Sequence, residues 1–135
     1  MQVNEDCLQS GSTILVVDDD ASVTASYSRV LKGRCRVLST NDGSTASKLL
    51  AAIWPVDLLV LDLTMPDYDG IELLQDLADK GSYLPVALIS GWNTEVLSSA
   101  GLLATALGHK LIGVYPKPTS IGKIVDEAGI SLNSP

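Results

Sequence analysis

Short apolar runs in this 135-residue chain are each followed by side chains that could do chemistry. Asp18, Asp19 and Asp20 follow the run at 13–17, and Asp62 follows the run at 56–61. Ser90 follows the run at 85–89, and Lys117 comes after the run at 111–115. Clustered carboxylates repel one another unless a cation joins them, and a few hard oxygen ligands with room for water suit Mg²⁺. A carboxylate beside Mg²⁺, a lysine and a hydroxyl can attack a phosphoryl group and become an acyl phosphate. The pattern therefore points to metal-assisted phosphoryl transfer, provided that these residues meet in one crevice.

The elements that must bring them together alternate regularly along the chain. Strands are predicted at 13–17, 36–39, 56–61, 85–89 and 111–115, and apolar residues recur at helical spacing after each of them. Three of these strands are nearly continuous apolar runs, which is typical of a parallel sheet covered on both faces. The pattern predicts an α/β fold of (βα)5 type, in which ligands bind beyond the carboxyl ends of the strands. The acids, the serine and the lysine all follow those ends.

Composition and charge exclude several other classes of protein. Sixteen acidic against nine basic residues give a net charge of −7, which disfavours direct binding to nucleic acid. Two cysteines and one histidine leave little for a disulfide framework or a zinc site. No glycine-rich phosphate loop occurs, and the acids at 18–20 would repel a flavin phosphate. We expect one domain in a reduced cytoplasmic setting, with no direct nucleic-acid or membrane binding.

Four segments in order resemble the receiver domain of two-component response regulators. They are ILVVDDD at 14–20, LVLDLTMPDYDG at 59–70, PVALIS at 85–90 and YPKP at 115–118. The resemblance covers nearly the whole chain and implies a flavodoxin-like three-layer sandwich, with a five-stranded parallel sheet in the order 2-1-3-4-5. We expect a flexible lead at 1–12, a receiver domain at 13–129 and a short tail at 130–135.

The same resemblance assigns roles to the acidic residues. Asp62 would be the phosphoacceptor. Asp19 and Asp62 would bind Mg²⁺ directly together with the backbone carbonyl of Thr64, whereas Asp18 would act mainly through water. Asp20 is better explained as the cap of the following helix than as a metal ligand.

Further roles and departures concern the later strands. Ser90 would be the switch hydroxyl, and Lys117 would pair with the phosphoryl oxygens, with its bond to Pro118 commonly cis in the family. The family's switch aromatic falls here on Val114, with Tyr115 next to it, which puts the usual coupling between serine and aromatic ring in doubt. The interval from Ser90 to Lys117 is longer than in minimal receivers. Segments 90–92 and 106–114 look like receivers attached to EAL-type cyclic-di-GMP phosphodiesterases.

The resemblance implies a switch rather than a turnover enzyme. It would take its phosphoryl group from a histidine kinase or a phosphotransfer protein and catalyse its own modification. The sequence leaves three alternatives open for the partner that responds to phosphorylation: an output domain, an output protein, or a second copy of the chain in a homodimer. The alternative is a non-phosphorylated interaction module, favoured by Val114 and the long interval but disfavoured by the intact acids and Lys117. A Mg²⁺-dependent phosphatase would lack a substrate-binding cap. His109, the one histidine, is expected on the surface.

Overall fold

Strands and helices alternate along the chain in the computed structural model, which describes residues 2–3, 12–33, 35–51, 56–64, 70–91 and 94–129. The strands are β1 (Gln2–Val3), β2 (Thr13–Val17), β3 (Arg36–Thr40), β4 (Leu58–Asp62), β5 (Pro85–Ser90) and β6 (Lys110–Pro116). The helices are α1 (Ala21–Leu31), α2 (Gly43–Ala51), α3 (Gly70–Asp79), α4 (Thr94–Ala106) and α5 (Ile121–Ala128). None of the described helices is long and apolar enough to span a membrane.

The sheet has the order β1-β3-β2-β4-β5-β6. Its last five strands are parallel, so the predicted order 2-1-3-4-5 is confirmed. Strand β1 was not predicted; it pairs antiparallel with β3, with Gln2 opposite Ser39. A two-residue strand carries too little hydrophobic pattern to be seen in the sequence, and only the free edge of β3 provides its hydrogen-bonding partner.

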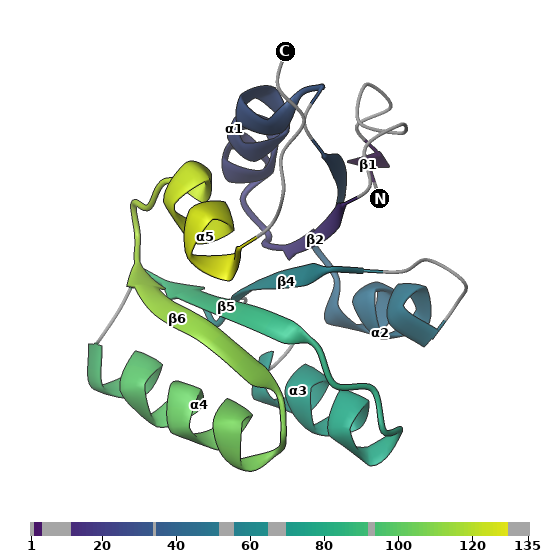
Figure 1. Cartoon of the computed structure of the whole chain (residues 1–135), viewed down its shortest axis with the longest axis vertical. Helices are drawn as coiled ribbons and strands as arrows, with labels where there is room; N and C mark the ends of the chain where they lie inside the picture. Colours follow the sequence, from purple (N-terminus) through teal and green to yellow (C-terminus); the bar gives the residue numbers. More distant parts are fainter. Residues whose placement is uncertain are drawn as a thin grey trace.

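Helices cover both faces of the sheet, which makes three layers (Figure 1). Helices α1 and α5 lie on one face, and α2, α3 and α4 lie on the other. Alternate residues of β2 divide between the two cores: Ile14 and Val16 pack with α1 and α5, whereas Leu15 and Val17 pack on the opposite face. This double burial explains why β2 and β4 are apolar at successive positions.

The prediction that His109 lies on the surface is wrong. The side chain is 3% exposed, and its Nδ1 accepts a hydrogen bond of 3.3 Å from the backbone N–H of Leu84. Nε2 therefore carries the proton and donates to the carbonyl of Leu74 at 2.9 Å. Gly108, at φ 101°, turns the chain after α4, so that the ring enters the space between α3 and β5. In the sequence, His109 is a polar residue that follows a glycine able to end a helix. The burial of its side chain could not be predicted from that pattern.

Replacing His109 by alanine is expected to destabilise the fold by about 2–3 kcal/mol, because the buried Leu84 N–H loses its acceptor and a cavity opens. His109→Asn keeps an acceptor near the position of Nδ1 but loses the contact with Leu74, so we expect a smaller loss. Urea unfolding of the three proteins measures both effects. Equal stability of parent and alanine variant would mean that the ring contributes no net stabilisation.

Candidate functional site

Three carboxylates converge at the carboxyl ends of β2 and β4. These strands are neighbours, with Val17 opposite Leu61, so that Asp18 and Asp62 emerge at the same edge of the sheet. Carboxylate oxygens of Asp18, Asp19 and Asp62 all lie within 4.8 Å of one another. Asp18 and Asp62 are buried, whereas Asp19 is exposed. The crevice inferred from the order of the strands is therefore present.

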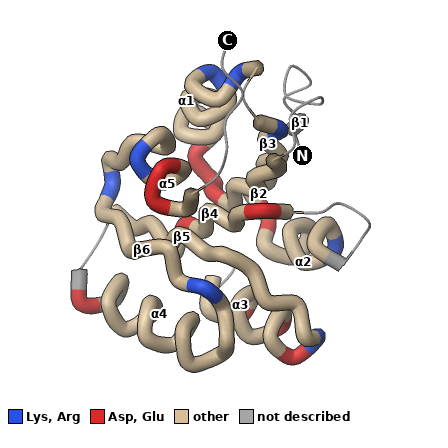
Figure 2. Tube along the Cα trace, in the orientation of Figure 1, with Lys and Arg blue, Asp and Glu red and all other residues tan. Residues whose placement is uncertain are grey.

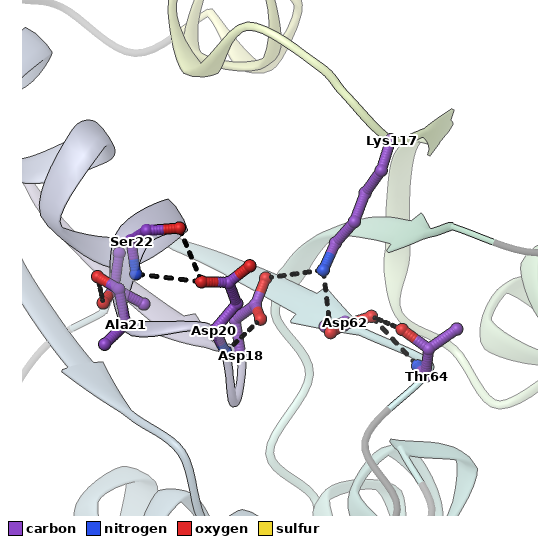
Figure 3. Close-up of polar contacts among 8 residues, drawn as sticks. Asp18, Asp20, Ala21, Ser22, Asp62, Thr64 and Lys117 are labelled. Atoms are coloured by element: carbon purple, nitrogen blue, oxygen red, sulfur yellow. Dashed lines mark hydrogen bonds and ion pairs between the residues drawn. The ribbon is translucent and has the colours of Figure 1, made fainter.

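Lys117 extends from the end of β6 to the two buried carboxylates (Figure 3). Its Nζ lies 3.1 Å from Oδ2 of Asp62, to which it donates a hydrogen bond, and 3.1 Å from Oδ2 of Asp18. The Lys117 backbone N–H donates to the carbonyl of Ser90 at 2.9 Å, which ties the two strand ends together. The peptide bond between Lys117 and Pro118 is cis, as the resemblance implied. Burial alone would lower the pKa of Lys117, but its hydrogen bond to Asp62 and its ion pair with Asp18 outweigh this effect and raise that pKa.

Both oxygens of Asp62 are held by neighbouring donors. Oδ2 accepts from Lys117, and Oδ1 accepts from the backbone N–H of Thr64 at 2.9 Å and from its hydroxyl at 2.6 Å. Because both of its oxygens are held in a buried site, the plane of the Asp62 carboxylate is fixed. The hydrogen bond from the Thr64 hydroxyl was not predicted, because the resemblance implied a role only for the backbone carbonyl of Thr64.

Asp18 has fewer hydrogen-bond donors than Asp62, the other buried acid of the cluster. Its Oδ1 accepts from the backbone N–H of Asp20 at 2.8 Å, but its buried Oδ2 accepts no hydrogen bond and has only the ion pair with Lys117. Burial raises the pKa of Asp18 from its ordinary 3.8 to about 6, and the neighbouring charge of Asp62 adds to this effect. A buried carboxylate oxygen that has an ion pair but accepts no hydrogen bond, beside two further carboxylates, suits a small hard cation.

Asp20 caps α1, as predicted, and faces away from the cluster. Its Oδ1 accepts from the backbone N–H of Ser22 at 2.9 Å and from the Ser22 hydroxyl at 2.6 Å, as Figure 3 shows. These hydrogen bonds lower the pKa of Asp20. The run of three acids thus divides into two residues at the cluster and one at the helix start.

Ser90 and Val114 lie on one face of the sheet, and Tyr115 lies on the other. Ser90 ends β5, is 1% exposed, and follows Leu88 by two residues, so its side chain points to the face of Leu88. Val114 is paired with Leu88 and packs in the same core. Tyr115 packs with α5 on the opposite face. Tyr115 therefore cannot take the place of an aromatic ring at position 114.

A cavity of about 460 Å³ adjoins Lys117 and was not predicted. Ser22, Val23, Ser26 and Tyr27 of α1 line one side of it, and the segment Lys117, Pro118 and Thr119 lines the other. These two segments are far apart in the sequence, so no local pattern could have revealed the cavity. Two of the segments that resemble the family lie partly outside the described residues, namely positions 65–69 of the segment 59–70 and position 92 of the segment 90–92.

Stability in the presence of a chelator should depend on the ionisation of Asp18. Because its pKa is raised on folding, the folded chain binds more protons than the unfolded chain between about pH 4 and 6, so this contribution to stability falls as pH rises through that window. Relative to the parent, Asp18→Asn should thus gain about 2 kcal/mol between pH 4.5 and pH 7. Urea unfolding at both pH values measures this difference. A difference that does not change with pH would mean that Asp18 titrates as it does in the unfolded chain.

The acids and the lysine lie together at the carboxyl edge of a doubly wound parallel sheet of the flavodoxin-like class, where such folds bind their ligands. The model of the response regulator receiver domain family matches residues 14–127. The chain belongs to this family. The response regulator MprA of Mycobacterium ulcerans is 34% identical over 113 residues, which make up 83% of this chain and 46% of that protein. MprA of Mycobacterium tuberculosis has the same identity and coverage. The chain spans about half the length of these curated relatives.

Solved structures agree with the fold. A response regulator from Colwellia psychrerythraea is 28% identical with a TM-score of 0.69, and the match covers 87% of this chain and 94% of that one. A response regulator from Burkholderia pseudomallei, described with a phosphorylated aspartic acid, a calcium ion and citrate, has a TM-score of 0.70 at 20% identity, covering 87% of this chain and 66% of that one. Receiver domains are switches and not classical turnover enzymes. The predicted likeness to receivers attached to EAL-type phosphodiesterases stays a prediction.

Proposed function

We propose that this chain accepts a phosphoryl group on Asp62, with Mg²⁺ at the acidic cluster, and thereby acts as a phosphorylation switch in two-component signalling. The observation that carries the proposal is the buried Asp62 carboxylate, with the Lys117 ammonium 3.1 Å away and two further carboxylates beside it. Response regulators interact with histidine kinases and output domains. A histidine kinase or phosphotransfer protein is accordingly the donor we propose.

The donor set suits Mg²⁺ on the chemistry of its own atoms. The Oδ2 of Asp18 is buried without a hydrogen bond, and the three carboxylates are close enough to share one ion. We assign Asp19, Asp62 and the backbone carbonyl of Thr64 as direct ligands and Asp18 as a ligand through water. When bound, Mg²⁺ would neutralise negative charge on the phosphoryl oxygens. The exposure of Asp19 leaves this side of the site open to water, which Mg²⁺ retains as ligands.

The proposed reaction moves one phosphoryl group between two side chains. A carboxylate oxygen of Asp62 forms a bond to phosphorus while the bond from phosphorus to the donor imidazole nitrogen breaks. The nitrogen keeps the electron pair and takes a proton from solvent, and Asp62 becomes an acyl phosphate. Lys117 faces the charge that develops on the phosphoryl oxygens, and Thr64 holds the plane of the carboxylate.

The cavity beside Lys117 is the place where we expect side chains of the donor to enter. Its lining is formed by hydroxyl and apolar side chains and contains no carboxylate among the described residues. A phosphorylated side chain would therefore approach Lys117 without passing an acid on this side. The proposed receiver unit is 13–129, with a lead at 1–12 and a tail at 130–135.

Intact-mass measurement with acetyl phosphate as the donor tests the proposal. With Mg²⁺ the chain should gain one phosphoryl group, and with a chelator it should gain none. Hydroxylamine should remove the added group, because it cleaves acyl phosphates and leaves phosphate esters of serine and threonine intact. A gain that is independent of metal or resistant to hydroxylamine would contradict the proposal.

The second candidate is a receiver-like interaction module that is never phosphorylated. Val114 at the usual aromatic position is the observation that favours it. The same mass experiment separates the two candidates, because the interaction module would gain no phosphoryl group under any condition.

A further inference from the structure

A second pocket adjoins the acidic cluster at the carboxyl ends of β2 and β3. Asp62 and Thr64 follow β4, on the other side of β2, so the pocket lies on the far side of Asp18 from them. The pocket has a volume of about 160 Å³, which corresponds to about five water molecules. Its polar lining consists of two carboxylates, three hydroxyls and an amide, from Asp18, Asp19, Thr24, Ser39, Thr40 and Asn41.

Ser39 places a hydroxyl in this pocket that no protein group satisfies. The residue is paired with Val16, which packs under α1, so its side chain points to the same face of the sheet. Ser39 is 5% exposed, and within the described part of the chain its hydroxyl makes no hydrogen bond. Buried polar groups are normally paired, so this hydroxyl is available to a group that enters the pocket.

Thr24 adds a second hydroxyl oxygen from α1. The residue is 6% exposed, and its Oγ1 donates to the carbonyl of Ala21 at 3.1 Å. A hydroxyl has one proton to donate, so towards the pocket this oxygen offers lone pairs only. Together with the carboxylates, such an oxygen binds a cation and repels an anion.

The protein supplies no cation of its own to this pocket. Figure 2 shows acidic residues at the start of α1, next to the end of β2. The nearby bases lie at the opposite ends of their elements, because Arg29 is in the last turn of α1 and Arg36 begins β3. Among the described residues, the lining contains no ammonium or guanidinium group. A cation from solvent is therefore the group that fits.

The charge balance favours a monovalent cation. The three carboxylates of the cluster and the Lys117 ammonium carry two net negative charges, which the proposed Mg²⁺ would offset. Phosphorylation would replace the single charge of Asp62 by about two charges on the phosphoryl group, so about one negative charge would remain. Na⁺ or K⁺ matches this charge, whereas a second divalent ion would exceed it.

We propose that the pocket binds a monovalent cation, Na⁺ or K⁺, through the hydroxyl oxygens of Ser39 and Thr24 and a carboxylate oxygen of Asp19, and that the ion binds more tightly once Asp62 is phosphorylated. Asp19 has two carboxylate oxygens, so one can face Mg²⁺ and the other the monovalent ion. The second part of this inference rests on the proposed phosphoryl acceptance by Asp62. By linkage, the bound ion would favour the phosphorylated chain by the same factor.

Urea unfolding of the full chain in a chelator tests the ion site. Sodium chloride, potassium chloride and tetramethylammonium chloride are compared at equal ionic strength, so that screening of the carboxylates is the same. Tetramethylammonium carries its charge behind methyl groups and cannot approach the oxygens closely. The urea midpoint of the parent should be higher in Na⁺ or K⁺ than in tetramethylammonium, because the ion binds the folded chain. The salt with the higher midpoint identifies the ion.

Three variants assign the effect to the pocket. Ser39→Ala removes a hydroxyl without a protein partner, so its midpoint should be the same in all three salts and close to that of the parent in tetramethylammonium. Thr24→Val should also lose the response to salt, at lower stability throughout because the Ala21 carbonyl loses its donor. Ser99→Ala, on the exposed side of α4, is the control and should respond to salt as the parent does.

The line width of the ²³Na resonance measures binding directly and tests the effect of phosphorylation. Na⁺ is titrated in a tetramethylammonium background before and after treatment with acetyl phosphate and Mg²⁺, with intact mass measured on the same samples. The Na⁺ concentration at half saturation should fall by about tenfold on phosphorylation, the order expected for one added charge in a partly solvated site. Ser39→Ala should show no saturable broadening.

The outcomes separate this inference from the proposed function. Equal midpoints of the parent in the three salts, or a Ser39→Ala response equal to that of the parent, would overturn the ion site. A loss of stability in Ser39→Ala that is the same in every salt would mean that the pocket holds water alone, and would overturn it as well. A phosphoryl gain without a change in Na⁺ affinity would overturn the coupling. The absence of any phosphoryl gain would overturn the proposed function, while the response to salt would still decide the ion site.

Discussion

Asp62→Asn is expected to abolish the gain of a phosphoryl group from acetyl phosphate in the presence of Mg²⁺. The amide keeps the shape of the side chain, and its oxygen can still accept from Thr64. It lacks the negative charge of the carboxylate, is a far weaker nucleophile and cannot form an acyl phosphate by this reaction. Intact mass after a fixed incubation measures the loss, which we expect to be complete.

Asp126→Asn is the matched control for that variant. It removes one negative charge from the exposed side of α5, away from the cluster, and should be phosphorylated like the parent. Phosphorylation of Asp62→Asn to the level of the control would assign the acceptor role to another residue. The geometry of the cluster would then have to serve metal binding alone.

Lys117→Met is expected to lower the free energy of unfolding in a chelator by about 2–3 kcal/mol. Lys117 is the ammonium between Asp18 and Asp62, and methionine keeps a similar unbranched shape without the charge. Removing one partner of a buried ion pair leaves the other charges uncompensated, at a cost of about 3–5 kcal/mol when the pair is fully buried. The Lys117 side chain is 24% exposed, so we expect less than this range.

Urea unfolding with chelator and with Mg²⁺ measures the effect. Mg²⁺ should stabilise Lys117→Met more than the parent, because the ion supplies the missing positive charge and no ammonium competes with it. Adding Asp18→Asn should recover part of the loss in chelator. The exposed Lys123 of α5 provides the control, since Lys123→Met should change stability little. If Lys117→Met were as stable as this control, the Lys117 ammonium would not be needed to offset the repulsion between the carboxylates of Asp18 and Asp62.

Sequence periodicity was sufficient to predict the layers, whereas the strand order came from the resemblance to receiver domains. Strand β2 was predicted with its observed bounds, and the other predicted strands overlap the observed ones, because continuous apolar runs and helical stripes are local properties of the chain. The position of Asp18, Asp62 and Lys117 after strand ends was enough to infer that they meet, provided that the first and third predicted strands are neighbours. Parallel strands place their carboxyl ends at one edge, so order along the chain translates directly into proximity.

The tertiary structure decided what each polar group contacts. His109 and Asp20 show the difference: Asp20 caps the helix next to it and could be predicted, whereas His109 bonds to Leu74 and Leu84, which lie more than twenty residues away. The position of Lys117 between two carboxylates likewise depends on the register of several strands.

The same holds for the contacts of β6. The sequence identified Val114 as a departure from the family pattern, but it could not reveal that Gly101 rests on Val114 or that Tyr115 points to α5. Side-chain direction in a strand follows from its pairing, and β6 has an irregularity in its pairing with β5 near Gly113. An apolar pattern predicts that a strand is buried, whereas only the packed neighbours determine which helix each of its residues meets.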